Sequence, residues 1–138
     1  MELPTSKYYK YKNFKISNNE IIENLELAFK TWGELNKKKD NAILICHGYT
    51  NHHFALDKNI GWFNNLMGSG KAIDTDKYFV ICSNMLGSSF GSTGPKSIYK
   101  KTNKPYGSNF PKMWTCALEN KIRIFVTNPH SSFISLSF

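Results

Sequence analysis

The sequence predicts an α/β fold in which an antiparallel strand pair leads into parallel strands. Two continuous apolar runs carry this prediction, AILIC at residues 42–46 and YFVIC at 78–82. Short apolar runs bounded by turn residues are typical of strands buried on both faces of a parallel sheet. Their separation of about 30 residues suits a strand, crossover, strand unit with a right-handed connection. Alternating apolar and polar residues in the first third of the chain complete the pattern.

The antiparallel pair is expected before residue 33. The segment NLELAFKTW (24–32) places apolar side chains at every second position, and YKNFKIS (11–17) alternates as well. Such alternation is the period of a half-buried strand, and the Asn18–Asn19 dipeptide between the two segments favours a turn. The following GELNKKKDN (33–41) breaks the period, so we expect a solvent-facing loop there.

The two apolar runs are expected to be joined by a crossover with little helix. Its glycines allow only a short helix at residues 62–67. Residues 85–112 are rich in glycine and proline and show no sustained period, which predicts a long loop that either has a functional role or is disordered. After Met113 the composition changes again, and KIRIFV (121–126) alternates like a strand.

Charge and cysteine content limit the possible partners. The 18 basic and 10 acidic residues give a net charge of +8, but the lysines are scattered and the densest run is 37–39. We therefore expect a solvated basic face, with no nucleic acid and no membrane as partner. Three widely spaced cysteines indicate reduced thiols, with Cys46 a small hydrophobe inside its apolar run. No segment approaches the roughly 18 consecutive apolar residues of a membrane-spanning helix, and the first residues lack the apolar core of a signal peptide. We therefore expect a cytoplasmic protein.

Candidate chemistry falls where the two parallel strands end. In open α/β sheets ligands bind at the carboxyl ends of the strands, which places CHGYT (46–50) and CSNMLG (82–87) at such a site. Gly48 would let the backbone turn sharply and aim successive N–H groups at an oxyanion. A plain strand end with a tight turn is the alternative. A metal site at His47, His52 and His53 is not expected, because adjacent histidines on an extended loop point apart.

The segment GSSFG (87–91) matches the G-x-S-x-G motif, with Ser89 as the candidate nucleophile. Glu119 and His130 follow in the order acid, then histidine, of one class of hydrolases. The motif depends on a strained turn from a strand into a helix, and STGPK (92–96) cannot open a helix. We do not expect this triad to function.

Four segments together indicate a family: TWGELN (31–36), NAILICHGYTNHH (41–53), the block from GWFNNLMG to GSTGP (61–95) and KPYGSNFP (104–111). They closely resemble the N-terminal part of homoserine O-acetyltransferases, which are α/β-hydrolase-fold enzymes related to homoserine O-succinyltransferases and serine acyltransferases. The resemblance covers residues 24–112. It implies that 1–112 form an incomplete α/β-hydrolase (acyltransferase) domain and that 113–138 are a divergent tail. It also implies that the 42–46 strand leaves an apolar edge open for the nucleophile strand.

The resemblance implies site residues in two places. The backbone N–H of Tyr49 would supply half of the oxyanion hole, although the family usually has Ala-Leu-Thr where this chain has Gly48, Tyr49 and Thr50. The GSTGP loop (91–95) would shape the cleft near the acyl site. The implied substrate-pocket residues are His47, Gly48, Thr50, Gly91, Ser92, Thr93 and Gly94. Family members carry the nucleophilic serine on a later elbow, and these 138 residues show no such elbow, triad acid, base or substrate-binding arginine.

The implied activity is acyl transfer from acetyl-CoA or succinyl-CoA to the hydroxyl of homoserine, through an acyl-serine, in methionine biosynthesis. No bound cofactor and no metal are implied. We expect a truncated acyltransferase that is inactive alone. The alternatives are a half-enzyme completed by a separate C-terminal chain and a basic non-catalytic binding protein. The expected partners are acyl-CoA and homoserine, together with a separate C-terminal half or a second copy of the chain in a homo-oligomer. The acyl donor and the acceptor, homoserine or serine, stay open.

Overall fold

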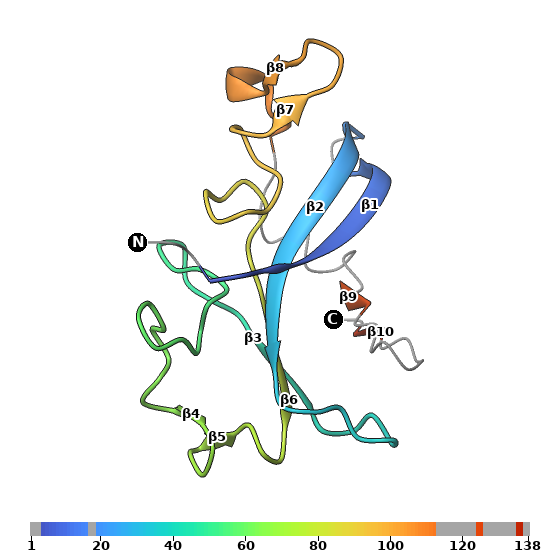
Figure 1. Ribbon diagram of the computed structural model, residues 1–138. Coiled ribbons are helices and arrows are strands. Elements are labelled where there is room, and N and C mark those ends of the chain that lie inside the picture. Colours follow the sequence, from blue (N-terminus) through green and yellow to red (C-terminus); the bar gives the residue numbers. More distant parts are fainter. Residues whose placement is uncertain (1–3, 17–18, 113–123, 126–134, 137–138) are drawn as a thin grey trace. The chain divides into compact units, whose positions relative to one another are not determined.

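The computed structural model describes residues 4–16, 19–112, 124–125 and 135–136 (Figure 1). Strands dominate these residues, which contain no α-helix and therefore no helix long and apolar enough to cross a membrane. The elements are β1 (Lys7–Lys15), β2 (Ile21–Trp32), β3 (Ala42–Ile45), β4 (Met67–Gly68), β5 (Ile73–Asp74), β6 (Phe79–Ser83), β7 (Ile98–Tyr99), β8 (Lys104–Pro105), the 3₁₀ helix η1 (Gly107–Asn109), β9 (Ile124–Phe125) and β10 (Ser135–Leu136).

The main sheet has four strands in the order β1-β2-β6-β3. Strand β2 pairs antiparallel with β6, and β6 pairs parallel with β3, where Leu44 lies opposite Ile81. Strands β1 and β2 are neighbours joined by a short turn, in which the Ile16 N–H donates to the Glu20 carbonyl at 3.0 Å. A link this short makes the pair antiparallel. The predicted antiparallel pair and the predicted parallel strands are both confirmed.

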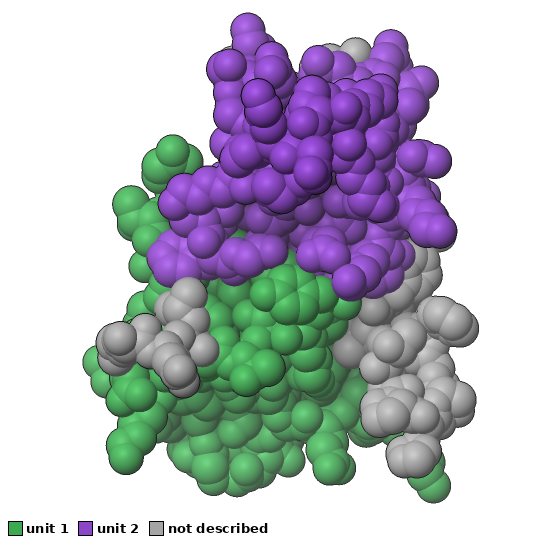
Figure 2. Space-filling view, turned by 45° about the horizontal axis from the view of Figure 1, so that its top comes forward, with its two compact units in different colours: residues 1–8, 28–84 green, residues 9–27, 85–138 purple. Residues whose placement is uncertain are grey.

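The chain divides into two compact units, which Figure 2 shows in different colours. Unit 1 comprises Met1–Tyr8 and Ala28–Asn84, and unit 2 comprises Tyr9–Leu27 and Met85–Phe138. Each unit is described separately below.

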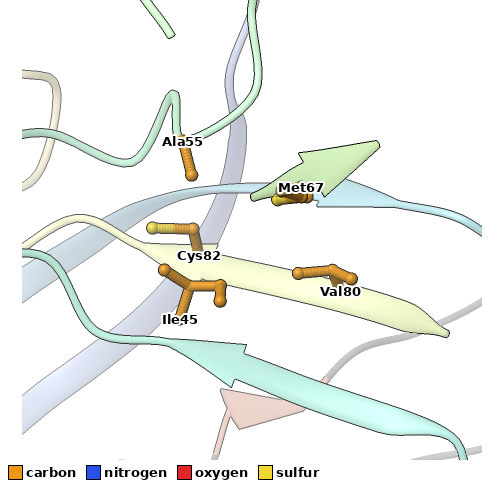
Figure 3. Close-up of a cluster of buried hydrophobic side chains, with 5 residues drawn as sticks. All are labelled: Ile45, Ala55, Met67, Val80 and Cys82. Carbon is orange, nitrogen blue, oxygen red and sulfur yellow. The ribbon is translucent and has the colours of Figure 1, made fainter. Parts of the chain in front are cut away.

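The core of unit 1 forms around β6. Four of its five residues, Phe79–Cys82, are buried, as predicted for a strand that is covered on both faces. Figure 3 shows side chains from β3, β4, β6 and the loop after β3 meeting in one cluster. The cluster comprises Ile45, Ala55, Met67, Val80 and Cys82.

The prediction for β3 is only partly right. The strand ends at Ile45, the only fully buried residue of its four, and Cys46 is exposed. The reason is the strand order: β3 is the last strand of the sheet within the described residues, so one edge lacks a covering strand there. The prediction that Cys46 behaves as a small hydrophobe was therefore wrong, whereas Cys82 in β6 is buried.

The short helix predicted at residues 62–67 is absent from the described crossover, which instead forms turns and the parallel pair β4 and β5. The Asn64 side chain accepts from the Asp57 N–H at 3.1 Å and donates to the Asp57 carbonyl at 2.8 Å. These bonds hold a compact loop in which the Phe63 N–H donates to Ala55, eight positions back, instead of to a helical partner. Local side-chain bonding has replaced the helix.

The remaining predictions concern loops and the tail. Residues 33–41 form an exposed loop, as predicted, while the long segment 85–112 contains the hairpin β7–β8 and η1. Gly33 is required where it stands, because its φ is +71° and an added Cβ would lie 2.2 Å from the Tyr78 carbonyl oxygen. Within the predicted tail strand, residues 124–125 form β9, which pairs with β10. Cys116, Glu119 and His130 lie outside the described residues.

Candidate functional site

The chain turns immediately after β3. The Asn51 N–H donates to the Gly48 carbonyl at 3.0 Å, which closes a four-residue β-turn over residues 48–51. The same carbonyl lies 2.9 Å from His47 Nδ1, and since a carbonyl can only accept, Nδ1–H is the donor. The Tyr49 side chain is 90% exposed. The turn is therefore defined by its backbone and leaves its side chains at the surface.

This geometry leaves the Tyr49 N–H outside the bond that closes the turn. Tyr49 occupies the second position of the turn, and a β-turn uses the carbonyl of its first residue and the N–H of its fourth. Gly48 needs no special conformation: its φ is not positive, and an added Cβ would meet no atom within 4 Å. The chain turns sharply here, as predicted, but the turn does not depend on the conformational freedom of glycine. An N–H at such a strand end can stabilise developing negative charge on an oxygen.

A buried histidine supports the loop that follows this turn. His53 is fully buried, its Nε2 lies 2.7 Å from Ser6 Oγ, and its ring centroid lies 4.0 Å from that of Phe54. Burial lowers the pKa of His53 to about 4, while the neighbouring Asn84 side chain opposes this shift. His53 is therefore neutral at pH 7. Its bond with Ser6 joins the loop after β3 to the segment before β1.

Further contacts fix the same loop on both sides of His53. The Trp62 indole N–H donates to the His52 carbonyl at 2.8 Å. Asp57 lies 3.8 Å from Lys30 of β2, and the backbone N–H of Asn59 lowers the pKa of Asp57. Asn84 is anchored too, since its backbone N–H donates to the Ala28 carbonyl at 2.8 Å. The candidate site in unit 1 is an exposed turn carried by a firmly anchored loop.

The second group of predicted site residues, 91–94, lies in unit 2. Gly91 is exposed, whereas Ser92, Thr93 and Gly94 are buried. Thr93 bonds with β2 through both backbone and side chain: its N–H donates to the Glu26 carbonyl at 2.8 Å, and its Oγ1 accepts from the Glu26 N–H at 2.7 Å. Its carbonyl accepts from the Gly87 N–H at 2.8 Å. Thr93 thus ties this loop to the strand beside it.

Ser89 does not lie on a nucleophile elbow. It is exposed in an irregular segment, and the one helical turn described between residues 87 and 112 is η1, far downstream at Gly107–Asn109. The segment GSSFG therefore lacks the turn from a strand into a helix on which the motif depends.

No group of three His, Cys, Asp or Glu side chains is placed to hold a metal ion in the part of the chain that the structure describes. The three histidines after β3 nevertheless interact. Burial lowers the pKa of His52, and the nearby His47 lowers it further. A cluster of this kind disfavours positive charge in the loop.

Sequence reasoning had singled out the turn but not the residues that hold it. Asn84 lies within CSNMLG (82–87), which the sequence had indicated because the segment follows a buried parallel strand; its role beside His53 had not been predicted. His53 is buried and His47 is not, and the local sequence does not indicate this difference. The contact with Ser6 spans 47 positions, and no local pattern indicates it.

Comparison with solved structures defines the class. The chain superposes on the crystal structure of an esterase with a TM-score of 0.70 and 33% identity, covering 78% of this chain and 32% of that one. It superposes on homoserine O-acetyltransferase from Bacillus anthracis with a TM-score of 0.68 and 35% identity, covering 80% of this chain and 33% of that one. The parallel strands and the turn after β3 thus belong to part of an α/β-hydrolase-type fold.

The curated relatives identify the family. The chain is 48% identical over 116 residues to homoserine O-acetyltransferase of Deferribacter desulfuricans, covering 79% of this chain and 31% of the relative. It is 54% identical over 102 residues to homoserine O-acetyltransferase of Methanobrevibacter ruminantium, covering 70% of this chain and 21% of the relative. No protein-family model matches the sequence. The chain is a homologue of the homoserine O-acetyltransferase family, and it spans about a third of the length of these relatives or less.

Proposed function

We propose that this chain is the part of a homoserine O-acetyltransferase-like enzyme that supplies the oxyanion donor. The observation that carries the proposal is the 48% identity over 116 residues, which includes the turn after β3. The reaction is transfer of an acyl group from acyl-CoA to the hydroxyl of homoserine. Acyl-CoA is a substrate here and not a bound cofactor, and we propose a cytoplasmic location.

In this reaction the Tyr49 N–H would act on the acyl carbonyl. A serine hydroxyl attacks the thioester carbon, a base takes its proton, and the carbonyl oxygen becomes an oxyanion that the N–H stabilises. The oxyanion collapses to an acyl-serine and releases CoA as its thiol. The homoserine hydroxyl then attacks the acyl-serine through a second oxyanion. The serine and the base would come from outside these 138 residues.

The proposal assigns residues 1–112 to the acyltransferase domain and treats 113–138 as a separate tail. The proposed substrate-pocket residues are His47, Gly48 and Thr50 of unit 1 and Gly91, Ser92, Thr93 and Gly94 of unit 2. The buried His53 would hold the donor turn in place. These 138 residues alone would then be inactive, because a donor without a nucleophile has no oxyanion to stabilise.

The test is complementation. The chain is co-expressed with the portion of the Deferribacter desulfuricans relative that it does not cover, and CoA release from acetyl-CoA with homoserine is followed by thiol detection. We expect turnover from the mixture and none from the chain alone. Succinyl-CoA and serine are assayed in parallel to resolve donor and acceptor. A co-purifying complex without turnover on any of these substrates would contradict the proposal.

A matched pair of variants tests the backbone donor. Tyr49→Pro removes the N–H, and proline is favoured at the second position of such a turn, so the turn should persist. Tyr49→Ala keeps the N–H and removes the side chain. Loss of one oxyanion donor costs about 100-fold or more in kcat. We expect a loss of that size in kcat for Tyr49→Pro and a loss less than about a tenth as large for Tyr49→Ala. Equal losses in the two variants would exclude a role for the backbone N–H.

A further inference from the structure

The hairpin β7–β8 of unit 2 lies in a long segment without acidic residues. From Lys77 to Lys112 the sequence contains no Asp or Glu, and its six lysines are 77, 96, 100, 101, 104 and 112. Three of these lie in or next to the hairpin turn, and all three are exposed. Such a concentration of one sign of charge attracts anions.

The hairpin has a defined geometry. Tyr99 of β7 lies opposite Lys104 of β8, so the two side chains share a face. The N–H groups of Thr102 and Asn103 both donate to the Tyr99 carbonyl, at 3.1 and 2.9 Å, and close the turn. Lys100 and Lys101 project from this turn. The lysines are therefore held within a few residues of one another on a rigid support.

Not all of these charges are available to a ligand. Lys101 pairs with Glu23 at 3.3 Å, and this contact raises the pKa of Lys101. Lys100 donates instead to the amide oxygen of Asn24 at 3.3 Å, a neutral acceptor that does not compensate its charge. Lys104 makes no ion pair within 4.0 Å with any described acidic residue. Lys100 and Lys104 thus carry the hairpin's uncompensated charge.

An aromatic stack supports the same face. The Tyr99 ring lies on the Tyr106 ring with centroids 4.6 Å apart, and Tyr106 contacts Phe110 edge to face at 5.4 Å. Tyr106 is buried whereas Tyr99 is half-buried, and the Lys101 ammonium lies 5.8 Å from the centroid of the Tyr99 ring. A half-exposed tyrosine beside lysines suits a ligand that has both an aromatic ring and phosphates.

We propose that this hairpin binds the phosphate-bearing nucleotide end of acyl-CoA, with Lys100 and Lys104 on the phosphates and Tyr99 against the adenine. This inference rests on the proposed function for the choice of ligand. The binding site itself is carried by the hairpin, its charges and its aromatic stack. It assigns a substrate-binding role to residues that lie outside both groups of predicted site residues.

The test is a direct binding measurement on the 138-residue chain. CoA, 3′,5′-ADP and pantetheine are titrated by calorimetry at low and physiological salt. We expect CoA and 3′,5′-ADP to bind with similar affinity, which falls as salt rises, and pantetheine, which lacks the phosphates, not to bind at the same concentrations. The variant K100E/K104E should weaken CoA binding by about tenfold or more.

Control variants separate a site from a general charge effect. K37E/K38E changes the net charge equally in the exposed loop of unit 1 and should alter CoA affinity by less than about twofold. K100R/K104R keeps both charges and should retain binding, which also excludes misfolding as the cause of the loss. Equal weakening by both glutamate pairs would overturn the inference, as would tight binding of a single-stranded oligonucleotide without binding of CoA. Either result would leave the complementation assay, and so the proposed function, untouched.

Discussion

The turn after β3 and the loop of residues 91–94 both carry predicted site residues, yet they are built in opposite ways. The turn is exposed and is closed by the bond from the Asn51 N–H to the Gly48 carbonyl. The loop is largely buried. Its residue Thr93 donates its N–H to Glu26, accepts from the Glu26 N–H at its hydroxyl oxygen, and accepts from the Gly87 N–H at its carbonyl. The described hydrogen bonds of the turn join residues close together in the chain, whereas those of Thr93 join it to Glu26 and Gly87.

The difference teaches which part of each segment matters. At an exposed turn the backbone N–H can serve a reaction while the side chain varies, which suits a chain that has Gly48 and Tyr49 where the family usually has Ala and Leu. In the buried loop each polar group satisfies another, so a changed side chain leaves a partner unsatisfied. Substitutions should therefore affect stability strongly in the loop and weakly in the turn.

Acid should have the largest effect, because the loop that carries the turn depends on a neutral His53. The pKa of His53 is lowered by burial from 6.5 to about 4, so an unfolded chain binds a proton between these pH values and the folded chain does not. Stability is therefore full above pH 6.5, falls as the pH drops towards 4, and has lost about 3 kcal/mol from this group below that. Urea unfolding at pH 7.5, 5.5 and 4 measures the loss.

Two variants show whether His53 is responsible. His53→Gln removes the titrating group and should flatten most of the slope between pH 6.5 and 4, whereas His47→Gln leaves the His53 cluster intact and should keep it. Asp57 and Asp74 have lowered pKa values, so their contribution is lost below pH 4, outside this window. An unchanged slope in His53→Gln would show that another group causes the acid sensitivity.

The next effect sharpens the contrast between the two segments. Thr93→Val keeps the shape of the side chain but removes Oγ1, the acceptor for the Glu26 N–H at 2.7 Å. A buried N–H left without an acceptor costs about 1 to 3 kcal/mol, so we expect a loss of unfolding free energy in that range. Thr50→Val, at the exposed turn, should change it by less than about 0.5 kcal/mol. Equal effects in a urea titration would show that the two segments do not differ.

The strands could be predicted from sequence because their signals are local. The alternation of residues 24–32 and the apolar run at 78–82 set strand type and burial directly, and the structure places β2 and β6 there. The helix expected at 62–67 could not be excluded in this way. Its absence depends on Asn64 bonding back to Asp57, a contact between specific side-chain and backbone atoms that periodicity does not describe.

The candidate site shows the same limit. The position of the turn followed from the rule that ligands bind at the carboxyl ends of parallel strands. The resemblance to acyltransferases indicated Tyr49 as the proposed donor. No local sequence pattern could have indicated it. The support from His53, Ser6 and Asn84 depends on tertiary contacts. The degree of exposure of β3 likewise depends on the strand order, which places it at the edge of the described sheet.

The smallest effect tests the turn itself. Gly48→Ala places a Cβ where no atom lies within 4 Å, at a φ that is not positive, so the folded state should accept it without strain. Because alanine restricts the unfolded chain more than glycine does, we expect unfolding free energy to rise by about 0.5 kcal/mol. Gly94→Ala is the contrast, since its Cβ would lie 3.0 Å from two backbone atoms of Gly87 and should lower stability. If Gly48→Ala were instead destabilising in the same urea titration, the turn would need glycine after all, and its tolerance of side-chain changes would no longer distinguish it from the loop.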